Sequence, residues 1–257
     1  MEDEELHQAH DKLFKAGFSV PENTAALLAA ELPASLSRHV DWARLELRSG
    51  TYVDSDLRES ASDLLFAAPV AGRAGFVYVL FEHQTSADPR LGLRLLRYML
   101  RIWERVAKET PPSEKLPLIL PVVLAQNKEV WKIDPSFASL LDFPPETASD
   151  FAEIIPNFTY RLLQLAEMPF ESIVGTPAGV FILRTMKAER LGELLSDAVW
   201  DEDLMMLVSR EVFELVLRYV LAADIDKNQF LHKLKAVHQP KFKIQHHEPS
   251  PTISTGR

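Results

Sequence analysis

Apolar positions in the first part of the chain recur with the spacing of helices and then with the alternation of strands. Residues 6–18 carry Leu6, Leu13, Phe14 and Phe18 on one side, which predicts a short amphipathic helix. A second helix is predicted from about Glu22 to Leu32, because Pro21 and Pro33 bracket it. The segment from Asp41 to Val53 favours a strand that is interrupted near Ser49-Gly50.

The central part predicts a hairpin, a long helix and a buried strand. Two strand-like runs, Asp63–Val70 and Gly75–Glu82, are separated by a connection that contains Gly. A helix is predicted to begin with Asp88 as N-cap and Pro89 at the first position, and to end near Lys108. Leu118–Leu124 is rich in aliphatic residues at both odd and even positions, as in a strand covered on both faces. This order predicts an α/β layout with one mixed β-sheet flanked by helices, and with a helical C-terminal part.

Helical periodicity dominates the second half of the sequence. Helices are predicted at 181–195, 204–223 and 226–238, and the polar segment that follows is expected to be a disordered tail. The predicted organisation is therefore a core at 1–165, a helical region at 166–240 and a tail at 241–257.

Composition restricts the class of protein. The chain has 257 residues, of which 47 % are hydrophobic and 25 % charged, as in ordinary globular proteins. It has no Cys, so disulfides, thiolate nucleophiles and Cys-based metal sites are excluded. The first residues are acidic where a signal peptide is basic, and the longest apolar run holds about ten residues where roughly 20 are needed to span a bilayer. We therefore expect a cytoplasmic protein with no membrane partner.

The formal net charge is −9, which argues against a protein that coats nucleic acid. It does not exclude an enzyme that contacts phosphates through one local basic stripe, because local potential steers a polyanion more than the total does. Nucleotide-binding glycine loops, the nucleophile-elbow motif and the HExxH zinc motif are all absent from the sequence. The pairs His7/His10 and His246/His247 are better explained as surface or tail residues than as metal ligands.

One pair of carboxylates stands out in the predicted hairpin. A turn centred between Gly72 and Arg73 places Asp63 directly opposite Glu82 on one face of the sheet, and Gln84 shares that face. Facing carboxylates repel each other unless a cation lies between them, and oxygen ligands suit Mg²⁺ or Mn²⁺. The alternative is that one acid lies at a frayed strand end or pairs with an arginine.

The predicted helix after Gln84 carries a basic stripe. Its five arginines fall within a sector roughly 80° wide, opposite a mostly apolar side; they are Arg90, Arg94, Arg97, Arg101 and Arg105. Such a stripe is suited to contacts with the phosphates of DNA. The alternative is a solvated face whose arginines pair with the many carboxylates of the chain.

Several sequence blocks occur in an order that is similar to one known family. They are His10-Asp-Lys-Leu-Phe-Lys15, Phe18-Ser-Val-Pro-Glu22, Asp56-Leu-Arg58, Ser62-Asp-Leu-Leu65, Tyr78-Val-Leu-Phe-Glu-His-Gln-Thr-Ser-Ala-Asp88, Arg94-Leu-Leu-Arg-Tyr-Met99 and Leu116-Pro-Leu-Ile-Leu-Pro121. Over about residues 10–165 the chain resembles the recombination-promoting nuclease (transposase-like) family of the PD-(D/E)XK nuclease superfamily. The resemblance implies that the α/β core at 1–165 is nuclease-like, with a restriction-endonuclease-like mixed β-sheet flanked by helices.

The resemblance implies a chemistry and a set of site residues. Asp63 and Glu82 match the two metal-binding acids of the superfamily, the backbone carbonyl of His83 matches a further metal ligand, and Gln84 stands where a lysine is usual. The implied reaction is hydrolysis of DNA phosphodiesters with Mg²⁺ as cofactor, or Mn²⁺ in its place. The metal lowers the pKa of a water molecule and screens the charge that develops on the phosphate. The amide of Gln84 can orient that water molecule. The implied partners are DNA and, for the C-terminal helices, a second copy of the chain.

Two positions depart from the family pattern. Asn127 lies where family members carry Tyr-His-Gly, and Gln164 begins the segment where they have Asp-Leu-Ser. Three hypotheses follow: a metal-dependent DNA endonuclease, a nuclease-like DNA-binding module that has lost its chemistry, and a self-associating or protein-binding partner of a mobile or defence element.

Overall fold

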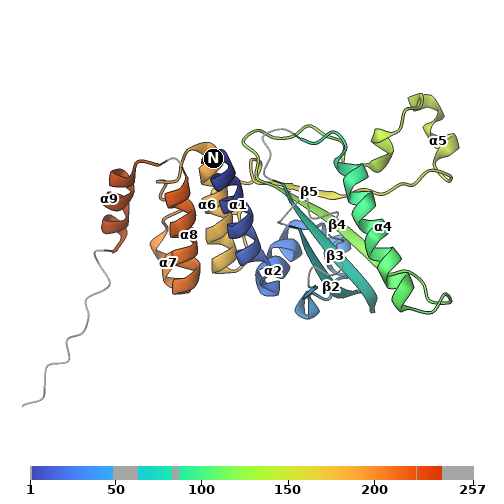
Figure 1. Cartoon of the computed structure of the whole chain (residues 1–257), viewed down its shortest axis with the longest axis horizontal. Helices are drawn as coiled ribbons and strands as arrows, with labels where there is room; N and C mark the ends of the chain where they lie inside the picture. Colours follow the sequence, from blue (N-terminus) through green and yellow to red (C-terminus); the bar gives the residue numbers. More distant parts are fainter. Residues whose placement is uncertain (1, 49–62, 83–86, 224, 239–257) are drawn as a thin grey trace, which may run out of the picture.

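The computed structural model describes residues 2–48, 63–82, 87–223 and 225–238, and Figure 1 shows their arrangement. The predicted tail at 241–257 and the candidate residues His83 and Gln84 lie outside the described residues. Within them, the predicted α/β class is confirmed: a mixed sheet is flanked by helices, and helices make up the C-terminal part.

Five strands form the sheet in the order of the sequence. They are β1 (Glu46–Arg48), β2 (Leu64–Val70), β3 (Arg73–Glu82), β4 (Leu118–Ala125) and β5 (Arg161–Gln164). The first three are antiparallel, whereas β3, β4 and β5 are parallel, so their carboxyl ends meet at one edge. Parallel neighbours need a crossover, which the helix α4 (Leu91–Glu109) provides between β3 and β4. The sequence pattern missed β5, which has four residues and no distinctive alternation.

The β2–β3 turn differs from the prediction by one residue. Val70 pairs with Arg73, so Ala71 and Gly72 form a two-residue turn, and both have positive φ, 49° and 73°. Two positive φ values are the mark of a type I′ hairpin turn, which matches the twist of the flanking strands. A turn centred between Gly72 and Arg73 was expected, and that register is wrong.

Alternate residues of each strand face two separate hydrophobic cores. One core contains Val77 and Val79 of β3 together with Phe14 of α1 (Glu2–Phe18), Leu28 of α2 (Pro21–Glu31) and Phe181 of α6 (Pro177–Leu191). The other core contains Leu65, Tyr78 and Val123 of the sheet and Leu95, Tyr98 and Ile102 of α4. The sheet is therefore covered by α1, α2 and α6 on one face and by α4 on the other.

The C-terminal helices begin and end where local signals place them. Thr176 caps α6 by accepting a hydrogen bond from the amide of Gly179, and Gly192 ends it with a φ of 71°. The helix predicted at 204–223 is two helices, α7 (Glu202–Leu207) and α8 (Arg210–Ala222), because Val208 is extended and Ser209 caps α8. Asp226 accepts hydrogen bonds from the amides that open α9 (Lys227–His238).

Other short elements depart from the prediction in their bounds. The predicted start of α4 is displaced: Asp88 accepts a hydrogen bond from the amide of Arg90 in a turn, and the helix begins at Leu91. Of the strand predicted at 41–53, residues 49–53 lie outside the described residues; among residues 41–48, β1 is a strand and residues 42–44 form a 3₁₀ turn. The remaining short helices are α3 (Ala34–Ser37), α5 (Ala148–Phe151) and 3₁₀ turns at 137–140, 145–147 and 170–172.

Packing is continuous across the predicted boundary at residue 165. The core under α1 and α2 is completed by Phe181 and Met186 of α6 and by Val216 and Tyr219 of α8, all of which are buried. In Figure 1 the helices α1, α6 and α8 lie side by side, with α9 at the end farthest from the sheet. The division into 1–165 and 166–240 stays a prediction.

None of the helices in the described part of the chain is long and apolar enough to cross a bilayer.

Candidate active site

Asp63 lies immediately before β2, on the face of the sheet that α4 covers. The hydroxyl group of Tyr78, in the middle of β3, donates a 2.6 Å hydrogen bond to Oδ2 of Asp63. Tyr78 is fully buried, and its ring contacts the ring of Tyr98 on α4 at 5.2 Å between centroids. The carboxylate of Asp63 is therefore held by a residue whose own position is fixed by the packing of the sheet and helix.

The protonation state of Tyr78 follows from its surroundings. Burial, and then the negative charge of Asp63, raise the pKa of Tyr78 well above its ordinary value of 10.0, although the positive charge of Arg94 lowers it in part. The hydroxyl group thus remains a hydrogen-bond donor to Asp63 across the physiological pH range.

The observed register changes the relation between the two candidate acids. Leu64 pairs with Val79, so the next position, Asp63, stands opposite Leu80 and not opposite Glu82. Glu82 is two residues farther along β3, and such diagonal neighbours have Cα atoms about 7–8 Å apart, within reach of long side chains. The direct pairing that was predicted is wrong, but Glu82 keeps the strand parity of Tyr78, whose hydroxyl binds Asp63.

Only part of the predicted acid–amide site falls in the described region. The side chain of Glu82, together with His83 and Gln84, lies outside the described residues, so their roles stay predictions. The backbone of Glu82 pairs with Ala125 of β4, and Ala125 pairs with Gln164 of β5. The structure therefore brings Gln164 into the same row across the sheet as Glu82.

The two departures from the family pattern contact each other. Nδ2 of Asn127 donates a 2.8 Å hydrogen bond to Oε1 of Gln164, and both residues are buried. Oε1 of Gln164 also accepts a 2.7 Å hydrogen bond from the amide of Trp131. This pair fastens the segment after β4 to the carboxyl end of β5. Sequence reasoning noted both residues but gave no sign that they form a pair.

An ion pair lies just beyond the predicted site residues. Nη1 of Arg94, on the first turn of α4, is 3.6 Å from Oδ2 of Asp88, and both side chains are about one quarter exposed. Asp88 follows the segment that contains His83 and Gln84, and Arg94 is one helical turn from Tyr98. The ion pair therefore joins α4 to the chain leaving β3.

The arginines of α4 do not share one environment. Arg90, Arg97 and Arg101 are exposed, whereas Arg94 and Arg105 are partly buried. Arg101 pairs with Glu104 and Arg105 with Glu109, at 3.1 and 3.0 Å. The alternative reading of the stripe, in which carboxylates neutralise its arginines, thus holds for part of it, and binding of DNA by the stripe stays a prediction.

A cavity of about 310 Å³ opens beside this ion pair. Its wall includes Asp88 and Gly92 at the start of α4, and Asp134 and Tyr160 from the segments that flank the sheet. Burial raises the pKa of Tyr160 from its ordinary value of 10.0, and the negative charges of Asp134 and Asp88 raise it further. The charged residues that line the cavity, Asp88 and Asp134, are both acidic, and Asp88 is paired with Arg94.

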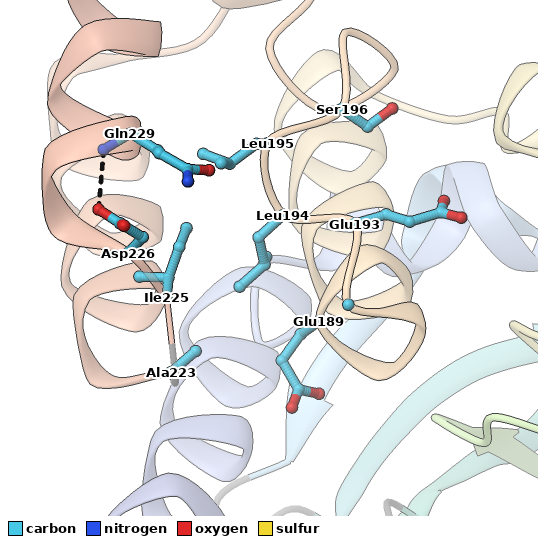
Figure 2. A pocket seen from close by; sticks show the side chains of 10 residues that line it. Glu189, Glu193, Leu194, Leu195, Ser196, Ala223, Ile225, Asp226 and Gln229 are labelled. Atoms are coloured by element: carbon cyan, nitrogen blue, oxygen red, sulfur yellow. Dashed lines mark hydrogen bonds between the residues drawn. The ribbon is translucent and has the colours of Figure 1, made fainter.

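A larger concavity, of about 690 Å³, lies far from Asp63 among the C-terminal helices. Figure 2 shows its wall, which includes Glu189 and Glu193 at the end of α6 and Asp226 at the start of α9. Burial raises the pKa of Glu189, partly offset by Arg190. Nε2 of Gln126, which follows β4, donates to Glu189 at 3.1 Å. These contacts tie α6 to the sheet and leave Glu189 engaged in the packing of the helices.

A divalent cation fits what is described of the Asp63 site, although the set of ligands is incomplete there. Asp63 offers a carboxylate held in a fixed orientation, and oxygen ligands of this kind suit Mg²⁺. Among the described residues, no cluster of three or more His, Asp or Glu side chains could hold a metal ion. Further ligands would have to be the side-chain carboxylate of Glu82 and the backbone carbonyl of His83. Both groups lie outside the described part of the chain.

Comparison with known proteins identifies the family. Residues 8–199, more than half of the chain, match the model of the YhgA-like transposase family. The chain belongs to this family. The resemblance to the recombination-promoting nucleases noted from the sequence motifs is thereby confirmed.

Curated relatives carry names that fit this family. Recombination-promoting nuclease RpnC of Escherichia coli (strain K12) is 25 % identical over 205 residues, which are 79 % of this chain and 62 % of the relative. Recombination-promoting nuclease RpnD of Escherichia coli O157:H7 is 27 % identical over 242 residues, 88 % of this chain and 86 % of the relative. The chain thus spans less than two thirds of the length of RpnC.

A further relative has a name that denotes lost activity. The inactive recombination-promoting nuclease-like protein RpnE of Escherichia coli (strain K12) is 28 % identical over 114 residues, which are 44 % of this chain and 38 % of the relative. No solved structure matches the chain at a significant level.

Proposed function

We propose that this protein is a metal-dependent DNA endonuclease that hydrolyses phosphodiester bonds in a process linked to recombination or mobile elements. The observation that carries the proposal is the fixed carboxylate of Asp63, held by the buried hydroxyl group of Tyr78 at the edge where the parallel strands end. Membership of the family and the names of the relatives support the same class of reaction.

In this proposal each candidate site residue has a specific role. Asp63, Glu82 and the backbone carbonyl of His83 hold Mg²⁺, or Mn²⁺ in its place, and Gln84 orients the attacking water molecule. The bound metal supplies an activated water molecule and screens the charge that develops on the phosphate. The exposed arginines at the solvent face of α4 contact the DNA backbone on either side of the cut.

A plasmid-nicking assay tests the proposal. Wild-type protein is expected to cleave plasmid DNA in Mg²⁺ or Mn²⁺ and to lose this activity in EDTA. Asp63→Asn keeps the shape of the side chain and an acceptor for Tyr78 but removes its charge. We expect it to lower the cleavage rate by at least about a hundredfold, because a neutral amide is a poor ligand for Mg²⁺.

The controls separate loss of chemistry from loss of fold. Thermal unfolding and circular dichroism of the Asp63→Asn protein should match those of the wild type. Calorimetric titration with Mg²⁺ alone should show binding to the wild-type protein and not to the variant. Metal-independent cleavage, or an Asp63→Asn protein as active as the wild type, would contradict the proposed mechanism.

A nuclease-like DNA-binding module without chemistry is the second candidate. The observation that favours it is the Asn127–Gln164 pair: both positions depart from the family pattern, and Gln164 brings an amide into the row of Glu82. The name of the relative RpnE, an inactive recombination-promoting nuclease-like protein, is in keeping with this candidate. This candidate predicts salt-dependent DNA binding with no metal-dependent product, whereas a protein-binding partner would show neither DNA binding nor a change in Tm with Mg²⁺.

A further inference from the structure

The negative charge of the candidate site poses a problem for a DNA-cutting enzyme. Asp63, Asp88 and Asp134 place carboxylates on or beside the face that α4 covers, and the substrate is itself an anion. Coulomb repulsion between a phosphodiester and these groups is strong in a partly buried site, where the effective dielectric constant is low. A basic side chain close to Asp63 would reduce that repulsion.

Arg94 is placed where such a charge is needed. Its side chain is about one quarter exposed, and it lies one helical turn from Tyr98, whose ring packs on Tyr78. Tyr78 in turn donates to Asp63. The guanidinium group is held 3.6 Å from the carboxylate of Asp88, which borders the 310 Å³ cavity. The electrostatic influence of Arg94 on Tyr78 agrees with this placement.

We propose that Arg94 contacts the scissile phosphodiester and stabilises the negative charge that develops on it, with Asp88 positioning its guanidinium group. The planar guanidinium group can donate two parallel hydrogen bonds to phosphate oxygens and also carries a positive charge. The side-chain amide of Gln84 is neutral and cannot supply that charge. This inference rests on the proposed endonuclease function, and it separates Arg94 from the exposed arginines of the stripe.

The surroundings of the other arginines of α4 support this distinction between Arg94 and the exposed arginines. The side chain of Arg101 is about half exposed, and its ion pair with Glu104 is formed on the surface of α4. Arg97 is exposed, and no ion pair is formed by it within the described part of the chain. Exposed arginines at these positions can bind the charged DNA backbone, whereas Arg94 is the arginine whose charge acts on Tyr78.

Steady-state cleavage by matched variants tests the role of Arg94. Arg94→Gln removes the charge with little change in helix propensity, and we expect kcat to fall by about a hundredfold, as when a donor to a developing oxyanion is removed. Arg94→Lys keeps the charge but not the fork, so its kcat should lie between those of Arg94→Gln and the wild type. Arg97→Gln should raise KM and leave kcat unchanged. Arg210→Gln, at an exposed position on α8, should change neither KM nor kcat.

The outcomes distinguish this inference from the proposed function. If the wild type cleaves DNA and Asp63→Asn does not, but Arg94→Gln retains the wild-type kcat, the role of Arg94 is wrong and the endonuclease stands. If the wild type shows no metal-dependent cleavage, the proposed function itself fails. If Arg94→Gln does not fold, the folded Arg94→Lys protein decides, because a kcat equal to that of the wild type together with a raised KM would assign Arg94 to DNA binding alone.

Discussion

At the scale of single residues, the candidate site depends on hydrogen bonds that fix side chains before any ligand binds. Tyr78 cannot turn away from Asp63, because it is fully buried and its ring packs against Tyr98. A catalytic carboxylate held in this way needs no reorganisation when substrate arrives. Asn127 and Gln164 show the same principle in a structural role, since their mutual hydrogen bond fixes the segment that leads to Trp131.

Replacing Tyr78 with phenylalanine tests the positioning of Asp63. Loss of the hydroxyl group removes a hydrogen bond to a charged acceptor, and we expect kcat to fall about tenfold, with a loss of about 2 kcal/mol in the free energy of unfolding. Tyr219→Phe is the control, because it deletes a buried hydroxyl group that binds His10 on the other face of the sheet. The inference about Tyr78 would be overturned if both variants lost the same fraction of kcat at similar stability.

At the scale of elements, the β2–β3 hairpin sets which residues share a row with Asp63. The Ala71-Gly72 turn lies one residue before the predicted turn centre, so the partner of Asp63 on β3 shifts by two residues, from Glu82 to Leu80, and Glu82 moves from a directly opposed position to a diagonal one. An alanine with a φ of 49° is unusual, because its Cβ crowds the backbone in the left-handed region. The turn is therefore formed at some cost in stability, which the pairing of the two strands offsets.

The turn can be stabilised by a residue that tolerates positive φ. Asn-Gly is the preferred sequence of a type I′ turn, so Ala71→Asn should raise the free energy of unfolding by about 1 kcal/mol and Tm by roughly 2–4 °C. Gly72→Ala, at a φ of 73° with open space around it, should lower stability by a similar amount. Thermal unfolding of both variants checks the turn, and opposite signs are the required result.

At the scale of the whole molecule, the C-terminal helices are tied to the sheet by buried polar contacts as well as by apolar packing. Nζ of Lys187 on α6 donates a 2.8 Å hydrogen bond to the carbonyl of Leu165 and lies 5.3 Å above the ring of Phe170. Lys187 is buried, and burial lowers its pKa from the ordinary value of 10.5, although the charge of Glu193 partly opposes the change. The hydrogen bond from Lys187 to Leu165 therefore joins the predicted helical region to the predicted core.

The lowered pKa of Lys187 makes stability depend on pH. Between the lowered pKa and 10.5, the unfolded chain binds more protons at this lysine than the folded protein, so the free energy of unfolding rises with pH. Lys187→Met lacks this contribution. Urea unfolding of both proteins from about pH 8 to about 10.5 should therefore show the wild type gaining stability relative to the variant. If the difference in free energy of unfolding between the two proteins did not change with pH, burial would not lower the pKa of Lys187.

The sequence by itself determined the family of this protein and most of its long elements, although it missed β5. The apolar run in Gly75–Glu82, the aliphatic run Leu118–Leu124 and the helical spacing after Asp88 reflect burial, which each segment encodes locally, and they predicted the α/β class. Local pattern also marked Asp63 and the arginines of α4. Only the tertiary structure decided the register of the hairpin, the pairing of β5 with β4 and the contacts of Arg94 and Gln164. The physical reason is that these contacts join segments distant in the sequence, whose relative placement depends on how both cores pack.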